Sequence, residues 1–229
     1  MGAASCGDCH FRDGRGSEIF PTPRGPRVAP PVFGAGLLQW IAGGESGLRW
    51  DGAVPTVQDQ TRGALLEDHG IDPDQVDQIS EREFEQLVKY VEFLSVPARS
   101  YAAHDDPQIR RGSVAFIEAG CASCHTPTQK TSPDAPAMFR DIVLRPYTDM
   151  KRHQVTGQPI RTPPLWGLGR NIDLLENNGR PLLFMHDGRA SSLLEAIQSH
   201  GGEASASRAA FQSMDPADRE AVIAFLRSL

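Results

Sequence analysis

All four cysteines of this sequence lie in two copies of one short pattern, in which a histidine directly follows a Cys-x-x-Cys pair. The copies are Cys6-x-x-Cys9-His10 and Cys121-x-x-Cys124-His125. Paired cysteines of this kind serve disulfide bridges, structural zinc sites or covalent attachment of a c-type haem. The disulfide and zinc interpretations leave both histidines without a role. Zinc ribbons also separate their cysteine pairs by only about 15–20 residues, far less than the spacing here.

Covalent attachment of haem c gives every residue of the pattern a role. In this chemistry the two thiols bond to the haem vinyl groups, and the histidine that follows becomes the proximal ligand of the iron. We therefore predict two covalently bound haem c groups. The predicted attachment residues are Cys6, Cys9, Cys121 and Cys124, and the predicted proximal ligands are His10 and His125.

The composition is typical of a globular protein with a modest core. Hydrophobic residues make up 39% of the chain and charged residues 23%, but aromatic residues make up only 7%. A large bound cofactor would help to fill such a core. The net charge of −6 gives no indication of nucleic acid or an anionic membrane surface as a partner. No run of about 18 apolar residues occurs, so we expect no transmembrane helix.

Four segments carry helical signals. They begin at the Ser80 capping box, at residue 107, at Ser192 and at Asp215-Pro216. Pro97 is expected to end the first of these helices. Residues 126–180 are expected to be mostly loop, and no strand alternation is evident. The sequence therefore predicts an all-α fold with long ordered loops and little or no β structure.

The sequence also contains a degenerate internal repeat. The segment APPVFGAG at 29–36 matches TPPLWGLG at 162–169, and WDGAVPTVQ at 50–58 matches HDGRASSLL at 186–194. Each half shows the same order of cysteine motif, Pro-Pro segment, Asp-Gly segment and helix. We therefore predict two tandem cytochrome c-like haem domains, residues 1–105 and 106–229.

The second ligand of each iron decides its chemistry, because iron with one protein ligand stays open to a small oxidant. In the second half, His200 lies at the predicted end of the helix that follows Asp187. We predict that His200 is the distal ligand of the second haem, with Met185 and Met138 as the alternative ligands. A solvated histidine at a helix end is the other interpretation.

The repeat places a different residue at the corresponding position of the first half. The offset from Asp187 to His200, applied to Asp51, leads to Ala64, and alanine cannot ligate iron. The first haem is therefore expected to have an open sixth position. The polar side chains that follow in the sequence can hydrogen-bond to a peroxide and move its proton. They are Gln60, Glu67, Asp68 and His69, of which His69 is also a candidate sixth ligand that would close the site.

With these residues in view, nearly the whole chain resembles the di-haem cytochrome c peroxidase superfamily. It is most similar to the di-haem oxidoreductases that are also labelled thiol oxidoreductases. The segments that carry the resemblance are CGDCHFRDGRG, APPVFGAGLL, DHGI, GCASCHTP, YTDMKRH, RTPPLWGLG, FMHDGRASSLLEAIQSHGGEA and AVIAFLRSL.

The resemblance implies that the two haems have different functions. In the superfamily the N-terminal haem is peroxidatic and the C-terminal haem transfers electrons, and the distal ligand of the latter falls at the position of His200. A Trp-Asp-Gly…Gln…acid pattern lines the peroxidatic pocket, which makes Gln60 and Asp68 the implied catalytic residues. A tryptophan often relays electrons between the haems, and the candidates are Trp40, Trp50 and Trp166.

The resemblance also implies partners and a location. Electrons would come from a small redox protein or another donor, and hydrogen peroxide or an unknown substrate would accept them. Some relatives hold a structural calcium between the domains. Haem c is attached outside the bacterial cytoplasm, so a periplasmic location is expected, although no signal peptide precedes Cys6 and the first domain is expected to be truncated.

Two functions from different classes remain open. One is a peroxidase-like haem oxidoreductase, and the other is an electron carrier in which both irons have two protein ligands and no catalysis occurs. Two further histidines are expected to have local roles only: His186 is expected to hydrogen-bond beside the Asp-Gly turn, and His153 is expected to be solvated in a polar loop.

Overall fold

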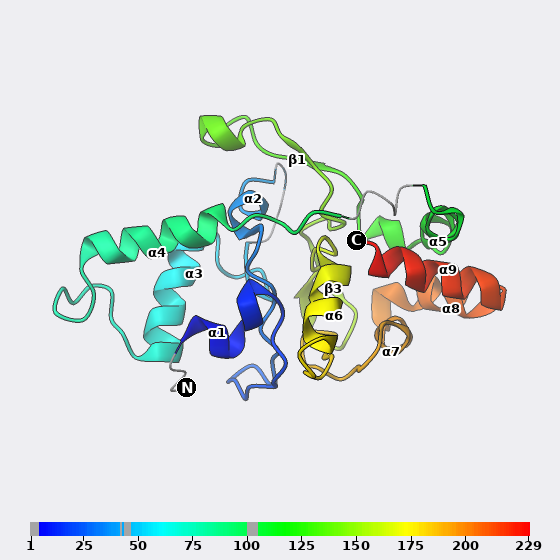
Figure 1. Ribbon diagram of the computed structural model, residues 1–229, viewed down its shortest axis with the longest axis horizontal. Coiled ribbons are helices and arrows are strands. Elements are labelled where there is room, and N and C mark those ends of the chain that lie inside the picture. The colour runs from blue at the N-terminus through cyan, green and yellow to red at the C-terminus, as the bar shows by residue number, and fades with distance from the viewer. Residues whose placement is uncertain (1–4, 42, 44–46, 100–104) are drawn as a thin grey trace.

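The computed structural model describes residues 5–41, 43, 47–99 and 105–229. The molecule is elongated, with the first half of the chain at one end and the last helices at the other (Figure 1). Helix makes up 44% of the structure and strand 8%, so the prediction of a mainly helical fold is confirmed. Among the described helices, none is long and apolar enough to cross a bilayer.

The helices follow one another in both halves with long connections between them. The α-helices are α1 (Cys6–Cys9), α2 (Ala35–Leu38), α3 (Val57–Ala64), α4 (Glu81–Phe93), α5 (Pro107–Glu118), α6 (Leu168–Glu176), α7 (Leu193–Gln198), α8 (Ser205–Ser213) and α9 (Pro216–Arg227). Single turns of 3-10 helix are η1 (Phe11–Asp13), η4 (Cys121–Ser123), η5 (Ala137–Phe139) and η6 (Gly202–Ala204), and η2 (Leu65–His69) is a π-helix.

Local capping residues explain why the predicted helices form where they do. Ser80 makes the expected capping box with Glu83 at the start of α4, and Ser192 caps α7 by accepting from the backbone of Glu195. Helix α5 begins with proline after an aspartate cap, as does α9. These four predictions are confirmed, although α4 ends at Phe93, before Pro97.

The loop predicted over residues 126–180 contains structure that the sequence did not reveal. Two short antiparallel pairs occur there: β1 (Gln129–Lys130) with β2 (Val143–Leu144), and β3 (Arg152–Gln154) with β4 (Pro159–Arg161). Strands of two or three residues are too short to show alternation. Helix α6 also lies in this region, and its N-cap is a glycine without a side chain to signal the start.

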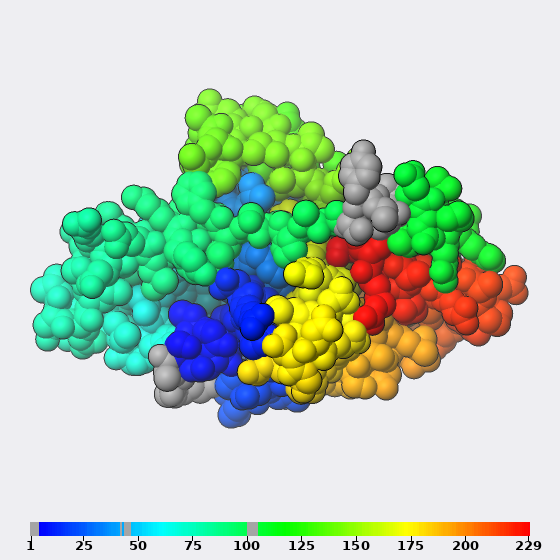
Figure 2. Space-filling model, viewed as in Figure 1, coloured from blue at the N-terminus to red at the C-terminus, as the bar shows by residue number. Residues whose placement is uncertain are grey.

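The segment between β1 and β2 stands out from the body of the molecule above α4 (Figure 2). Its η5 turn rests on the end of that helix, where the rings of Phe139 and Phe93 lie 5.6 Å apart between centroids. This contact joins a segment of the second half to a helix of the first.

The buried hydrophobic residues form two clusters. The second cluster is built around the crossing of α5 and α9, where Gly112 allows close approach, since a Cβ atom there would lie 1.8 Å from the carbonyl oxygen of Ala221. The first cluster packs α2, α3 and α4 together but also includes Leu144, Met150 and Trp166. The division at residues 105 and 106 stays a prediction.

The predicted repeat is visible as reciprocal packing. Gly34 and Gly167 occupy equivalent positions and both adopt the left-handed conformation, with φ of 75° and 69°. A Cβ atom on Gly34 would meet Trp166 at 2.5 Å, and one on Gly167 would meet Phe33 at 2.8 Å. Because Phe33 and Trp166 are themselves equivalent in the repeat, each aromatic ring covers the glycine of the other half.

The Asp-Gly segments are also equivalent in three dimensions. In each, a left-handed glycine turns the chain, a residue three positions earlier also has positive φ, and an isolated antiparallel bridge closes the turn. A hydroxyl then caps the helix that follows. The matching residues are Arg49 and Met185, Gly52 and Gly188, the bridges Leu48–Val54 and Phe184–Ala190, and the caps Thr56 and Ser192.

Candidate haem sites

The four cysteines are free thiols at the surface or half-buried. Burial raises the pKa of Cys121 to about 11, which keeps this thiol protonated until it reacts. The disulfide interpretation therefore has no support in the described residues. The zinc interpretation has none either, because the metal-ligand cluster found among the described residues contains Cys124 with Asp149 and His153, not a second cysteine.

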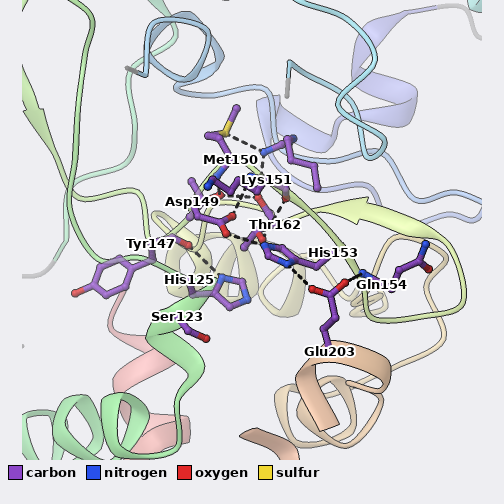
Figure 3. Close-up of polar contacts among 12 residues, drawn as sticks. Ser123, His125, Tyr147, Asp149, Met150, Lys151, His153, Gln154, Thr162 and Glu203 are labelled. Atoms are coloured by element: carbon purple, nitrogen blue, oxygen red, sulfur yellow. Dashed lines mark hydrogen bonds and ion pairs between the residues drawn. The ribbon is translucent and has the colours of Figure 1, made fainter. Parts of the chain in front are cut away.

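Both predicted proximal histidines are oriented by a backbone carbonyl. Nδ1 of His10 lies 2.7 Å from the oxygen of Pro30, and Nδ1 of His125 lies 3.1 Å from the oxygen of Tyr147 (Figure 3). A carbonyl can only accept, so Nδ1 carries the proton and Nε2 is left with a free lone pair. A metal-binding imidazole commonly has this tautomer, with the ring nitrogen that does not bind the metal donating to a carbonyl or carboxylate.

The protein environment keeps both imidazoles neutral. Burial, and then the proximity of His200, lowers the pKa of His125 to about 4. Burial also lowers the pKa of His10, although the bond to Pro30 and the charge of Asp68 oppose that shift. A neutral imidazole is the form that ligates a metal.

His200 lies just after α7, and its ring faces that of His125. The two ring centroids are 6.5 Å apart, and Nδ1 of His200 donates to the carbonyl oxygen of Ala196 at 2.7 Å, which again leaves Nε2 free. A metal–imidazole bond is about 2 Å long, and a ring centre lies about 1.2 Å from its nitrogen, so a shared metal places the centroids about 6.4 Å apart. The spacing therefore fits one iron between these two rings.

The two methionines considered as alternative ligands for the second haem, Met138 and Met185, lie in different surroundings from His200. Met138 is 60% exposed on the projecting β1–β2 segment, and Met185 packs against the second core cluster. Of the three candidates, His200 is the one whose recorded contact is with His125, at 6.5 Å between ring centroids. Among the described residues the geometry favours His200.

Around the first cysteine motif, the structure places Asp68 and His69 on the π-helix η2. Nε2 of His69 lies 3.9 Å from Sγ of Cys6. Burial and then the charge of Asp68 raise the pKa of Cys9, which places this carboxylate close to the same motif. A π-helical turn is rare and is often found at functional sites.

Gln60 contacts Arg49 rather than Asp68. Its Oε1 accepts from Nε of Arg49 at 2.5 Å, and Nη1 of Arg49 pairs with Oε2 of Glu67 at 3.3 Å. Arg49 therefore joins Gln60 to Glu67, and no described contact joins Gln60 to Asp68. No local sequence signal points to Arg49, because its contact with Gln60 of α3 depends on the fold, in which Arg49 itself has a left-handed backbone.

The residue equivalent to His200 in the first half lies at the end of α3. Helices α3 and α7 start from equivalent caps, so the register of the repeat is kept through both Asp-Gly turns. Ala64 is the last residue of α3, at the point where the π-helix begins. A methyl side chain stands there in place of the imidazole.

The three tryptophans differ in their surroundings. Trp50 is buried, and its Nε1 donates to the carbonyl oxygen of Val28 at 2.7 Å. Its ring centroid lies 6.4 Å from that of His186, the equivalent residue of the repeat. Trp166 is buried, and its Nε1 has no partner among the described residues; Trp40 is only partly buried. Trp50 is thus the ring at which the two Asp-Gly segments meet.

The expectation of a solvated His153 is wrong. Figure 3 shows this ring held between two carboxylates: Nε2 lies 2.7 Å from Asp149 and Nδ1 lies 3.1 Å from Glu203. The backbone N–H of Asp149 donates to the carbonyl oxygen of Cys124, which ties this cluster to the second cysteine motif. With sulfur and nitrogen among its donors, it does not suit calcium, and the structural calcium stays a prediction.

A mainly helical chain whose two related halves each present a Cys-x-x-Cys-His segment and an oriented imidazole has the features of a multi-haem c-type protein. Comparison with protein families agrees: the model described as "Di-haem oxidoreductase, putative peroxidase" matches residues 52–229. The chain belongs to this family. Membership implies two haems, and the histidine geometry fits them.

The fold is also that of solved structures. Hydrazine synthase of Kuenenia stuttgartiensis is similar with a TM-score of 0.63 at 15% identity, over 98% of this chain and 81% of that one. A MauG-like protein associated with microbial copper homeostasis is similar with a TM-score of 0.56 at 18% identity, over the same shares of the two chains. At such identities the likeness concerns the fold alone. No curated protein matches the sequence.

Proposed function

We propose that this di-haem oxidoreductase reduces hydrogen peroxide or a related oxidant at its first haem, with electrons delivered through the second. When bound, a haem with two protein ligands transfers electrons, and a haem with one leaves the iron open to an oxidant. The observation that carries the proposal is the difference at one position of the repeat: His200 faces His125 at 6.5 Å, and its equivalent is Ala64.

The chain's own residues would hold the two groups in different ways. The four cysteines attach them, and His10 and His125 offer Nε2 from one side, each fixed by a carbonyl. His200 offers a second nitrogen in the C-terminal half. Family membership supports two haems, and the orienting hydrogen bonds support these ligands.

Proton transfer is assigned to the polar groups beside the first cysteine motif. Reduction of one peroxide to two waters consumes two electrons and two protons. In this proposal Asp68 would pass a proton to the departing oxygen, and Gln60, held by Arg49, would orient the oxidant; the charge of Asp68 near Cys9 and the Arg49–Gln60 hydrogen bond support these roles. Glu67 pairs with Arg49 and so stabilises that orientation.

Trp50 is the proposed path for electrons between the halves. It is buried at the contact between the two Asp-Gly segments, and its hydrogen bond to Val28 fixes the ring. A small redox protein is the proposed electron donor. A calcium ion between the halves is also proposed. Attachment of haem c supports a periplasmic location.

A second function rests on the position of His69. Its Nε2 lies 3.9 Å from the sulfur of Cys6, beside the site where the first haem would attach. If this imidazole moved onto the iron, both haems would have two protein ligands, and the chain would be an electron carrier. Peroxide consumption separates the two functions, because a carrier with both irons closed consumes none.

The test uses the protein expressed with an export signal, so that haem is attached. The reduced protein should consume peroxide. Asp68→Asn should lower the rate of peroxide consumption by about 10²-fold, because general acid–base catalysis by one side chain typically contributes a factor of this order. Asp74→Asn is the matched control, because Asp74 is an exposed carboxylate paired with Arg62. An unchanged rate in Asp68→Asn would remove this residue from the mechanism, and no peroxide consumption at all would favour the carrier.

A further inference from the structure

Two arginines are buried without a carboxylate partner. Arg15 is 9% exposed and Arg161 is 4% exposed, and neither forms an ion pair with any described residue. Other arginines are paired, as Arg227 is with Glu176 and Arg189 with Asp187. A buried charge is costly unless it is neutralised and hydrogen-bonded. The carboxylates of Asp149 and Asp51 oppose the lowering of the Arg161 pKa from a distance, but among the described residues neither arginine has a carboxylate in direct contact.

Arg15 reaches from the first half into the second. Its guanidinium donates to the carbonyl oxygens of Leu183 and Met185, and it lies 5.4 Å above the ring of Trp50. Nη1 donates to no described residue. Two nitrogens of the side chain, Nε and Nη2, are thus hydrogen-bonded, and the third, Nη1, can donate to a ligand.

Arg161 makes the reverse connection. Its Nε donates to the carbonyl oxygen of Arg49 at 3.0 Å, and its Nη1 donates to the carbonyl oxygen of Thr162 at 3.2 Å. Its backbone N–H donates to the carbonyl oxygen of Trp50 at 2.7 Å. Nη2 donates to no described residue. Met150 and Thr162, which line this guanidinium, lie above the His125 site in Figure 3.

The two side chains therefore cross the contact between the halves in opposite directions. The Arg15 guanidinium lies over the Trp50 ring, whereas Arg161 contacts Trp50 through its backbone N–H. Burial lowers the pKa of each to about 10, which still leaves both cationic at neutral pH. Each cation keeps one nitrogen that donates to no described residue, and such a pair of donors suits anionic oxygen acceptors.

We propose that Arg15 and Arg161 bind the propionate carboxylates of the two haems at the contact between the halves. A guanidinium matches a carboxylate in shape and charge. A haem attached at its cysteines would carry two propionate carboxylates on the porphyrin edge away from the thioether bonds, and these carboxylates would be stabilised by cationic hydrogen-bond donors. The inference rests on the haem occupancy contained in the proposed function, but not on peroxide chemistry.

The proposal has a measurable electrostatic consequence. A buried cation beside a haem favours the reduced iron, which carries one positive charge fewer. Removing the cation should therefore lower the midpoint potential of the haem concerned. The carboxylate would also lose its donor, which changes the propionate bending bands in the resonance Raman spectrum.

The test compares Arg15→Gln and Arg161→Gln in the protein with both haems attached. Each should lower one midpoint by the equivalent of a tenfold change in the reduction equilibrium, about 59 mV for one electron, and should shift the propionate bands. Arg15→Lys and Arg161→Lys keep the charge and should recover most of the midpoint. Arg227→Gln, an exposed arginine paired with Glu176, is the control and should change neither.

Two results would overturn the proposal. One is unchanged midpoints and unchanged propionate bands in both glutamine variants with both haems attached. The other comes from the wild-type protein and needs no variant: if a free anion fills the site instead, the midpoints and the melting temperature will depend on phosphate concentration at constant ionic strength. The proposal expects no such dependence. Neither readout depends on peroxide turnover, so a protein that fails as a peroxidase still tests this inference.

Discussion

The close packing of α6 on the end of α9 gives a sharp prediction for Gly169→Ala. A Cβ atom at Gly169 would lie 1.8 Å from the carbonyl oxygen of Arg227, and ordinary contact begins at 3.4 Å. Because the obstacle is backbone, no rotamer change relieves it, and the two helices must separate by roughly 1.6 Å. The backbone N–H of Gly169 also donates to the carbonyl oxygen of Leu229 at 2.9 Å.

The competing free energies can be compared. Alanine is favoured over glycine inside a helix by about 1 kcal/mol. Against this, an overpacked site costs about 1–3 kcal/mol, and the strained hydrogen bond costs about 1 kcal/mol more. We expect a net loss of about 2 kcal/mol, which for a chain of this size lowers the melting temperature by about 4–8 °C.

The assay is thermal unfolding of the protein with both haems attached, followed by circular dichroism. Arg170→Ala is the matched control, because Arg170 is exposed on the same helix and its replacement should change the free energy of unfolding by no more than about 0.5 kcal/mol. A melting temperature of Gly169→Ala equal to or above that of the wild type would refute the packing argument. Gly36→Ala should behave in the same way in the first half, since its Cβ atom would lie 2.1 Å from the carbonyl oxygen of Glu92.

Two further predictions concern the histidines of the second half. His200→Ala removes the proposed second ligand, so the ferric high-spin fraction should rise from about one haem in two to both haems; an unchanged optical and spin-resonance spectrum would exclude His200 as a ligand. For His153, burial lowers the pKa, but the hydrogen bonds to Asp149 and Glu203 outweigh it and the net shift is upward. The stability that this histidine contributes should therefore be complete below its unfolded pKa of about 6.5 and be lost as the pH rises through the folded value. The difference in unfolding free energy between wild type and His153→Gln should be largest between about pH 5 and 6, and a difference that grows toward pH 9 would contradict the cluster shown in Figure 3.

Features that depend only on residues close together in the sequence could be predicted from it. The cysteine motifs predict the attachment sites by themselves, and the Ser80 and Ser192 caps locate two helices because a cap is a local contact. The repeat aligns Gly34 with Gly167, and both glycines make the same left-handed turn.

Features that depend on burial or on distant partners could not be predicted. The chain has 23 lysines and arginines, and nothing local distinguishes Arg15 and Arg161 from those on the surface. The charge on His153 depends on Glu203, which is supplied by another turn of the chain. Likewise, the contact of Arg49 with Gln60 and Glu67 could not be predicted, because it needs the folded Asp-Gly turn.

The difference between Ala64 and His200 at equivalent positions is the central claim, and low-temperature spin resonance of the ferric protein tests it most directly. The protein must carry both haems and be free of added ligands. The account predicts one high-spin and one low-spin haem in equal amounts, with the low-spin signal typical of two imidazole ligands. Two low-spin haems, with no high-spin signal, would contradict it.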